Sequence, residues 1–155
     1  MKLFDIMVAD AIVPEFKART RNEAIDELVE SLIRAGAVAK KSAASITKAI
    51  LAREAQATTG IGKGVALPHA KLEGISKPIG TIGRSSEGID FAALDSKPVY
   101  SVILLLSNPH KPNEHLQAME TIFKHFQRDM FRKFLRQSQT TEAIIDLIKE
   151  ADELS

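Results

Sequence analysis

The sequence predicts an α/β fold, a single-domain sandwich in which helices flank a mixed sheet. Helical segments, marked by apolar residues three and four positions apart, lie before, between and after short extended segments. One extended segment, residues 99–106, is apolar at nearly every position, which is typical of a strand buried on both faces. The chain has 155 residues, of which 45% are hydrophobic, so we expect one domain over 1–155 with a sizeable core.

The first part of the chain contains two predicted helices. Thr20 and Glu23 have the spacing of a capping box, and apolar residues follow at helical spacing until a glycine ends the segment, which predicts a helix over 21–34. A second helix is predicted over 42–55. Glycines then become frequent, so residues 58–64 are predicted to form a loop.

Extended segments and further helices make up the rest of the chain. The proline at position 68 biases Leu67 to β geometry, and the predicted strands cover residues 65–67, 79–82 and 99–106. Three helices are then predicted, one starting near Asn113 and the others over 129–136 and 141–154. The pattern does not give the order of the strands in the sheet.

Composition excludes several classes of protein. Lys and Arg number 21 and Asp and Glu 20, so the net charge of +1 gives no overall attraction to nucleic acid or an anionic membrane. Cysteine is absent, which excludes disulfide scaffolds, thiol catalysis and zinc ribbons. Asp5 and Asp10 interrupt the stretch where a secretory signal needs apolar residues, and no apolar run approaches the ~20 residues of a membrane span. We therefore expect a cytoplasmic protein without membrane insertion.

Residues 53–69 carry the densest functional signal. His69 follows a short extended segment and Pro68, whose fixed φ holds the imidazole in a defined place. Upstream lie groups that suit phosphate oxygens: a guanidinium, two hydroxyls and the backbone amides of glycines. The predicted phosphoryl-binding residues are Arg53, Thr58, Thr59, Gly60 and Gly62. Together they suit a phosphoryl group carried on a nucleophilic histidine.

A second histidine lies after the most apolar strand. Residues 107–116 follow its carboxyl end, where α/β proteins tend to place ligand sites. His115 falls in the first turn of the helix that begins near Asn113, where the partial positive charge of the helix favours anions and keeps an imidazole neutral. We predict that His69 is the nucleophile and His115 its electrophilic partner.

Several residues in these two segments also allow a purely structural interpretation. Glu54 either orients Arg53 or His69, or caps the end of its helix. The glycine-rich segment is not a P-loop, because its lysine is followed by Gly64 and not by Ser or Thr. His110 lies five residues before the second histidine, on a different helix face, so no helical metal pair is predicted and we expect no metal.

Two further features are predicted to be mainly structural. His125, beside Phe126, is interpreted as a structural or exposed residue. Arg128, Arg132 and Arg136 form a basic stripe at spacings of four residues, which indicates a solvated face or, as the alternative, a docking surface for a partner.

The site residues resemble the phosphorylation-site pattern of a known family, the fructose/mannitol-type IIA domain of the bacterial phosphoenolpyruvate-dependent sugar phosphotransferase system. Glu54 opens the pattern, Ile61 and Gly62 occupy its centre, and residues 65–70, VALPHA, close it without a mismatch. Ala70 stands where many members have glycine. Further along, residues 89–99 and the pair His115–Leu116 are similar to the family, so the resemblance covers nearly the whole chain.

The resemblance implies a fold and a mechanism. The fold is a mixed, about five-stranded sheet flanked by helices. His69 would accept a phosphoryl group from the histidine-containing phosphocarrier protein and hand it to a cysteine on a separate IIB protein, while Arg53 and His115 match positions around the phosphoryl group. No cofactor is implied. Because the chain has no cysteine and no membrane segment, we expect a stand-alone IIA protein.

Two alternatives to a sugar-transport phosphocarrier stay open. Stand-alone members often resemble the nitrogen-regulatory branch of the family, in which the phosphorylation state of His69 would control binding to a transporter or kinase. The second alternative is a hydrolase that uses His69 and His115 as base and acid.

Overall fold

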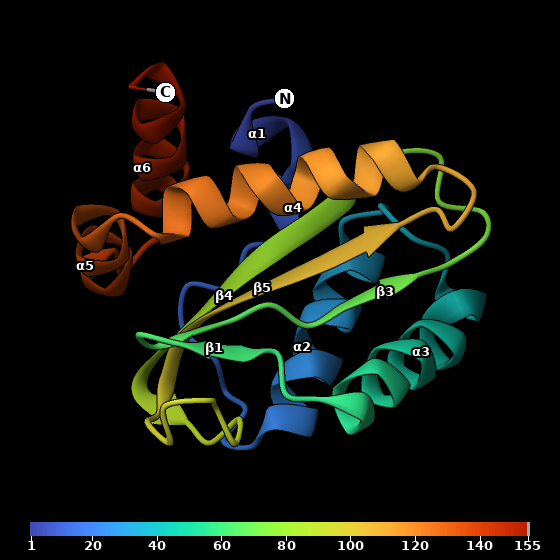
Figure 1. Ribbon diagram of the computed structural model, residues 1–155, viewed down its shortest axis with the longest axis horizontal. Coiled ribbons are helices and arrows are strands. Elements are labelled where there is room, and N and C mark those ends of the chain that lie inside the picture. The colour runs from blue at the N-terminus through green and yellow to red at the C-terminus, as the bar shows by residue number, and fades with distance from the viewer. Residues whose placement is uncertain (155) are drawn as a thin grey trace.

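The computed structural model describes residues 1–154 and contains a five-stranded mixed sheet (Figure 1). β5 is central: β4 pairs with it antiparallel along one side, whereas β2 and β3 follow one another along the other side and pair with it in parallel. β1 pairs antiparallel with β2. The strands are β1 (Gly60–Gly62), β2 (Val65–Ala66), β3 (His69–Lys71), β4 (Ile79–Ile89) and β5 (Val99–Ser107). The predicted fold class is confirmed.

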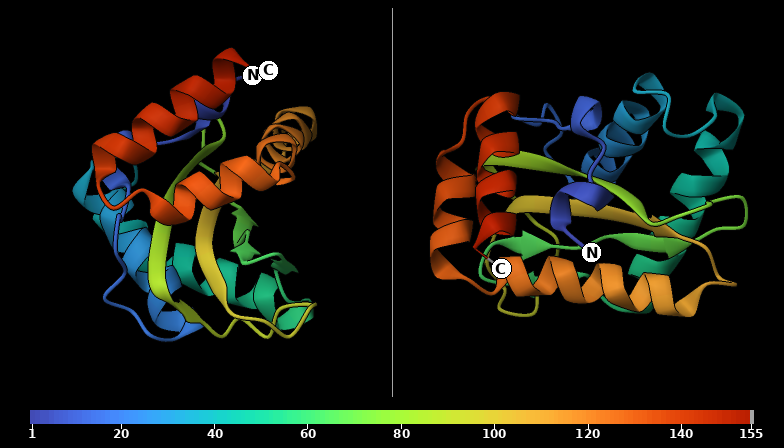
Figure 2. Two further views of the ribbon diagram at one scale, coloured as in Figure 1. Left: turned by 90° about the vertical axis from the view of Figure 1, so that its left-hand side faces the viewer. Right: turned by 90° about the horizontal axis from the view of Figure 1, so that it is seen from above.

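Helices cover both faces of the sheet. Figure 2 shows α2 and α3 on one side of the sheet and the other helices on the opposite side. Side chains of α2 and α3 pack in one hydrophobic cluster, and those of α1, α4, α5 and α6 pack in a second one. Over residues 1–154, every helix is too short or too polar to cross a bilayer. The helices are α1 (Leu3–Ile6), α2 (Arg21–Arg34), α3 (Ala43–Gln56), α4 (Pro112–Phe126), α5 (Asp129–Gln137) and α6 (Thr141–Glu153), with 3₁₀ turns at Ala9–Ala11 and Lys40–Ser42.

The alternation of side chains along β5 decides which face of the sheet holds each neighbouring residue. Val102 and Leu104 point into the cluster with α2 and α3, and Ile103 and Leu105 into the cluster with α4. The strand is therefore buried on both faces, as its apolar sequence predicts. His69 is in register with Leu105, so it lies on the α4 face of the sheet.

The predicted helices agree with the structure to within a few residues. α2 begins after Thr20, whose hydroxyl accepts from the backbone N–H of Glu23, while the Glu23 carboxylate accepts from the N–H of Thr20, so the predicted capping box is confirmed.

The predicted strands differ more. The prediction of a loop over 58–64 is wrong at Gly60–Gly62, because these residues pair with β2 and become β1. β4 extends to Ile89, well beyond the predicted 79–82, because Arg84 pairs with Ser101 and, after a register shift, Ile89 pairs with Val99.

The segment before α2 runs along the free edge of β4. Isolated parallel bridges join Met7 to Gly80 and Val13 to Gly83. Gly83 is needed at this crossing because an added Cβ would lie 2.0 Å from the ring of the buried Phe16. The segment therefore closes the edge of the sheet, which would otherwise expose unpaired backbone groups.

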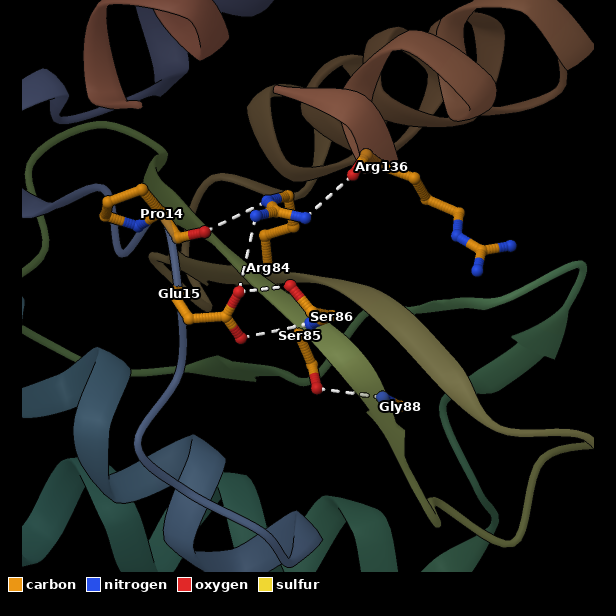
Figure 3. A network of polar contacts seen from close by, with 7 residues as sticks. All are labelled: Pro14, Glu15, Arg84, Ser85, Ser86, Gly88 and Arg136. Atoms are coloured by element: carbon orange, nitrogen blue, oxygen red, sulfur yellow. Dashed lines mark hydrogen bonds and ion pairs between the residues drawn. The ribbon is translucent and has the colours of Figure 1, made fainter. Parts of the chain in front are cut away.

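Arg84 of β4 holds this edge together (Figure 3). Its side chain is only 6% exposed and donates from Nε to the carbonyl of Pro14 at 3.0 Å and from Nη1 to the carbonyl of Arg136 at 2.7 Å. Nη2 lies 3.3 Å from a carboxylate oxygen of Glu15. One buried guanidinium thus joins the N-terminal segment, the sheet and the end of α5.

We expect the substitution Arg84→Ala to lower the free energy of unfolding by about 2–4 kcal/mol, because the carbonyls of Pro14 and Arg136 lose a buried, charged donor. The matched control is Arg19→Ala, which removes the exposed ion pair with Glu87 and is expected to have no measurable effect. Urea unfolding at pH 7 measures both. Equal losses in the two variants would contradict a structural role for the network.

Candidate functional site

His69 begins β3, directly after Leu67 and Pro68. Its Nδ1 lies 2.7 Å from the carbonyl oxygen of Leu67. Because a carbonyl only accepts, this contact assigns the proton to Nδ1 and leaves the lone pair on Nε2. The backbone around it is anchored, since the Pro68 carbonyl accepts from the N–H of Leu105 at 3.1 Å. The ring is half-buried and held in one tautomer with a free nucleophilic nitrogen.

His115 lies beside it, in the first turn of α4. The centroids of the two imidazole rings are 6.0 Å apart. Nδ1 of His115 lies 2.5 Å from the hydroxyl oxygen of Ser107, the last residue of β5. The structure therefore brings together the two histidines that the sequence predicts to act together, and the buried Ser107 orients the second one.

Lys71 is a member of this cluster that sequence reasoning missed. It lies two residues after His69 on the same strand, so its side chain shares the α4 face of the sheet. Its charge acts on both histidines and lowers the pKa of each. The sequence does contain a signal for Lys71, because residues two apart in a strand share a face. This signal could be used only once the strand was known to begin at His69.

Both histidines have a pKa below the usual value of 6.5. Burial is the main cause for each. For His69, the charges of Arg53 and Lys71 lower the pKa further, whereas the Leu67 carbonyl and Glu54 partly oppose the shift. For His115, the charges of Lys71 and His69 act in the same direction as burial. Both shifts favour the neutral imidazole at pH 7, the form in which Nε2 of His69 keeps its lone pair.

Arg53 and Glu54 lie in the last turn of α3. Arg53 is half-exposed and donates from Nη1 to the carbonyl of Ala57 at 2.9 Å, which fixes the end of the helix. Glu54 is buried, and its carboxylate accepts from the backbone N–H of Thr59 at 3.2 Å and from the Thr59 hydroxyl. The contacts of Glu54 therefore hold the loop after the helix, and its effect on His69 is electrostatic.

The remaining predicted phosphoryl-binding residues are engaged within their own loop. The Thr58 hydroxyl donates to the carbonyl of Phe91 at 2.8 Å and accepts from the N–H of Gly60 at 3.0 Å. The Thr59 hydroxyl donates to the buried carboxylate of α3. Gly62 is in register with Val65, at the end of β2 away from β3. Their contact with a phosphoryl group stays a prediction.

The other two histidines lie outside this cluster. His125 is 2% exposed, with Nδ1 3.0 Å from the Thr121 carbonyl and Nε2 3.2 Å from the Asp152 carboxylate, and its interpretation as a structural residue is supported. His110 is exposed and pairs with Glu73 at 2.9 Å. Among residues 1–154, no group of three or more His, Asp or Glu side chains is arranged to hold a metal ion.

Comparison with known proteins gives one family. The model of the family described as "Phosphoenolpyruvate-dependent sugar phosphotransferase system, EIIA 2" matches residues 5–151. A fructose-specific EIIABC component from Bacillus subtilis is 34% identical over 98% of this chain, which spans only 24% of that relative. A fructose-specific EIIA component from Haloferax volcanii is 34% identical over 86% of both proteins. A nitrogen regulatory protein from Bradyrhizobium diazoefficiens is 31% identical over 96% of this chain and 95% of its own length.

Solved structures share the fold. The nitrogen regulatory protein IIA-Ntr from Neisseria meningitidis superposes with a TM-score of 0.83 at 26% identity, over 93% of this chain and 97% of that one. The complex of IIA mannitol with phosphorylated IIB mannitol from Escherichia coli gives a TM-score of 0.75 at 23% identity, over 92% of this chain and 96% of that one.

We expect the substitution Lys71→Gln to raise the pKa of both His69 and His115, because it removes a positive charge that disfavours both imidazolium ions. Lys77→Gln, an exposed lysine in the following loop, is the matched control and should leave both values unchanged. Titration of the imidazole Cε1–H signals by NMR measures the shifts. An equal response to the two substitutions would show that Lys71 is not part of the cluster.

Proposed function

Because this chain belongs to the EIIA 2 family of the phosphoenolpyruvate-dependent sugar phosphotransferase system, we propose that it carries a phosphoryl group on Nε2 of His69. The group comes from the histidine-containing phosphocarrier protein and passes to a cysteine of a IIB protein. One observation carries the proposal: the Leu67 carbonyl holds the Nδ1 proton of a neutral imidazole, so Nε2 presents its lone pair beside a second histidine.

The transfer needs no net proton movement. A bond forms between Nε2 of His69 and phosphorus while the bond between phosphorus and the donor histidine breaks. The other ring nitrogen of the donor carries a proton throughout, so the donor leaves as a neutral imidazole. The ring of His69 gains positive charge as the new bond forms. Its Nδ1–H stays on the Leu67 carbonyl, which stabilises that charge. In the second transfer, a bond forms from the IIB sulfur to phosphorus and the phosphorus–Nε2 bond breaks.

The surroundings suit the charge on the transferred group. A phosphoryl group carries about −1.5 to −2 charges at pH 7, and its transition state spreads charge over three oxygens. With the Ser107 hydroxyl donating to Nδ1 of His115, Nε2 of that ring carries a proton and donates to a phosphoryl oxygen. Arg53 and Lys71 add two positive charges whose field reaches His69. The protein contributes position and electrostatic stabilisation.

A regulatory role is the second candidate, and specific relatives favour it. The chain matches a protein named nitrogen regulatory protein over nearly its full length, and superposes on another with that name. In this version the same phosphorylation of His69 changes the charge of the α4 face of the site and thereby the affinity for a transporter or kinase. Both candidates share the phosphorylation of His69. They differ in the following step, which is transfer to a IIB cysteine for the carrier and a change in partner binding for the regulator.

The phosphocarrier chemistry is tested by incubation with phosphoenolpyruvate, enzyme I and the phosphocarrier protein, followed by intact-mass analysis. Wild type should gain one acid-labile phosphoryl group, and His69→Ala none, because the nucleophile is gone. His115→Ala should still accept the group, with a rate lowered by about 100–1000-fold, the range for loss of one electrostatic donor. His110→Ala is the matched control and should react as wild type.

Phosphorylation of His69→Ala to the wild-type extent would overturn the assignment of the nucleophile. Continuous release of inorganic phosphate that is lost in both His69→Ala and His115→Ala would favour the hydrolase instead.

A second experiment distinguishes the carrier from the regulator. The protein is immobilised in its phosphorylated and unphosphorylated forms, and either a IIB protein or an extract that contains transporters and kinases is added. A carrier should lose its label to a IIB cysteine, whereas a regulator should keep it and capture different partners in the phosphorylated and unphosphorylated forms. His69→Glu, which adds a negative charge, is compared with His69→Ala. Identical partner sets for all forms would count against a switch.

A further inference from the structure

A cationic cleft of about 470 Å³ lies between the β1–β2 turn and α5, away from the histidine cluster. All of its lining residues are charged or carry an amide; they are Lys63, Asp129, Arg132, Lys133, Arg136 and Gln137. The basic stripe predicted from the sequence is therefore divided by the fold. Its last two members, Arg132 and Arg136, line the cleft, whereas Arg128 does not.

Most of the positive charge in the cleft has no opposite charge beside it. Asp129 pairs with Arg132, whose guanidinium also donates to the carbonyl of Phe126 at 2.7 Å. Within residues 1–154, no carboxylate forms an ion pair with Lys63, Lys133 or Arg136. The lining thus offers three unpaired positive charges at one concave place.

Arg136 is held in position before any ligand arrives. Its guanidinium carbon lies 3.6 Å from the centroid of the Tyr100 ring, in a cation–π contact. Its backbone carbonyl accepts from the buried Arg84, and Figure 3 shows its side chain directed away from that network. The Tyr100 ring in turn packs closely against Gly64 and Gly88. The face of a guanidinium is therefore fixed while its edge is left available for hydrogen bonds.

Lys63 is fixed from the other side of the cleft. It occupies the left-handed region with φ of +57°, in the turn between two glycines, and its backbone N–H donates to the Asp95 carboxylate at 3.0 Å. This bond fixes the backbone of Lys63, and its exposed ammonium forms no ion pair with a carboxylate of residues 1–154.

We propose that this cleft binds a small molecule that carries a phosphate monoester or diphosphate. Its volume falls in the range of ~300–1000 Å³ that is usual for ligand sites. A planar guanidinium matches two phosphate oxygens, and lysines add point charges. Three unpaired cations match a ligand of two or three negative charges. Because the lining is concave and has no apolar side chain, it suits a small polyanion better than an acidic protein segment.

The cleft is independent of the proposed chemistry at His69. On β5, Tyr100 lies at the cleft and Leu105 lies beside His69. These two positions are five residues apart along an extended strand, or about 17 Å. This exceeds the screening length of about 8 Å at physiological ionic strength. Binding in the cleft is therefore expected to be the same in wild type and in His69→Ala, so the two proposals can fail separately.

The test uses inorganic pyrophosphate as the probe, with binding followed by calorimetry and by amide NMR shifts. Wild type should bind saturably, with shifts at residues 63–64 and 129–137. Lys63→Gln and Arg136→Gln should each weaken binding by about tenfold, since each removes one contact with a charged oxygen. Arg128→Gln removes the same charge from the same stripe outside the cleft, and should bind within about twofold of wild type.

Three results would overturn the proposal: no saturable binding of pyrophosphate, equal weakening by Arg128→Gln and Arg136→Gln, or equal binding of sulfate at matched ionic strength, which would show only general attraction of anions. Saturable binding of a poly-glutamate peptide with no binding of pyrophosphate would assign the cleft to a protein partner instead. Thermal unfolding of each variant confirms that a loss of binding is not a loss of fold.

Discussion

The in-register parallel pairing of β3 with β5 is the constraint on which the site depends. It sets His69 opposite Leu105 and Lys71 opposite Ser107. Ser107 then reaches the ring of His115 at the start of α4. A shift of one residue would turn His69 to the other face of the sheet, into the cluster beneath α2 and α3. Such a shift is disfavoured because it would place His69 and the charged Lys71 in that apolar cluster, where Ala70 is now buried.

The electrostatic environment of the histidine cluster disfavours a proton on the ring nitrogen but suits a negatively charged phosphoryl group there. Burial and the nearby cations Arg53 and Lys71 lower the pKa of His69, so the ring stays neutral. In the proposed phosphorylated form, the same cations would attract the dianionic phosphoryl group. An arrangement that disfavours the imidazolium ion is therefore suited to a histidine that accepts and passes on phosphoryl groups, whether the receiver is a transport component or a regulated partner.

The opposite end of the sheet is organised around a different buried charge. Arg84 ties the N-terminal segment to β4 and to the last turn of α5. Arg136, at that last turn, lies over Tyr100 of β5 and faces the cationic cleft. The position of the cleft thus depends on contacts between the first residues of the chain, the central strands and a helix near the C-terminus, whereas the histidine cluster depends on β3, β5 and α4.

Features that arise from neighbouring residues could be predicted from the amino-acid sequence. The capping box and periodicity of α2, the two-sided burial of β5 and the pattern ending at His69 all depend on short-range spacing, which local physical preferences and one motif can identify.

The remaining features arise from tertiary contacts. Gly60–Gly62 became a strand through pairing with β2, Glu54 came to hold the following loop, and Lys71 joined the site because β3 starts at the histidine. Lys63 and Arg136 meet at one cleft although 73 positions separate them in the sequence. These features require contacts between residues far apart along the chain, and local preferences do not specify which distant segments will meet.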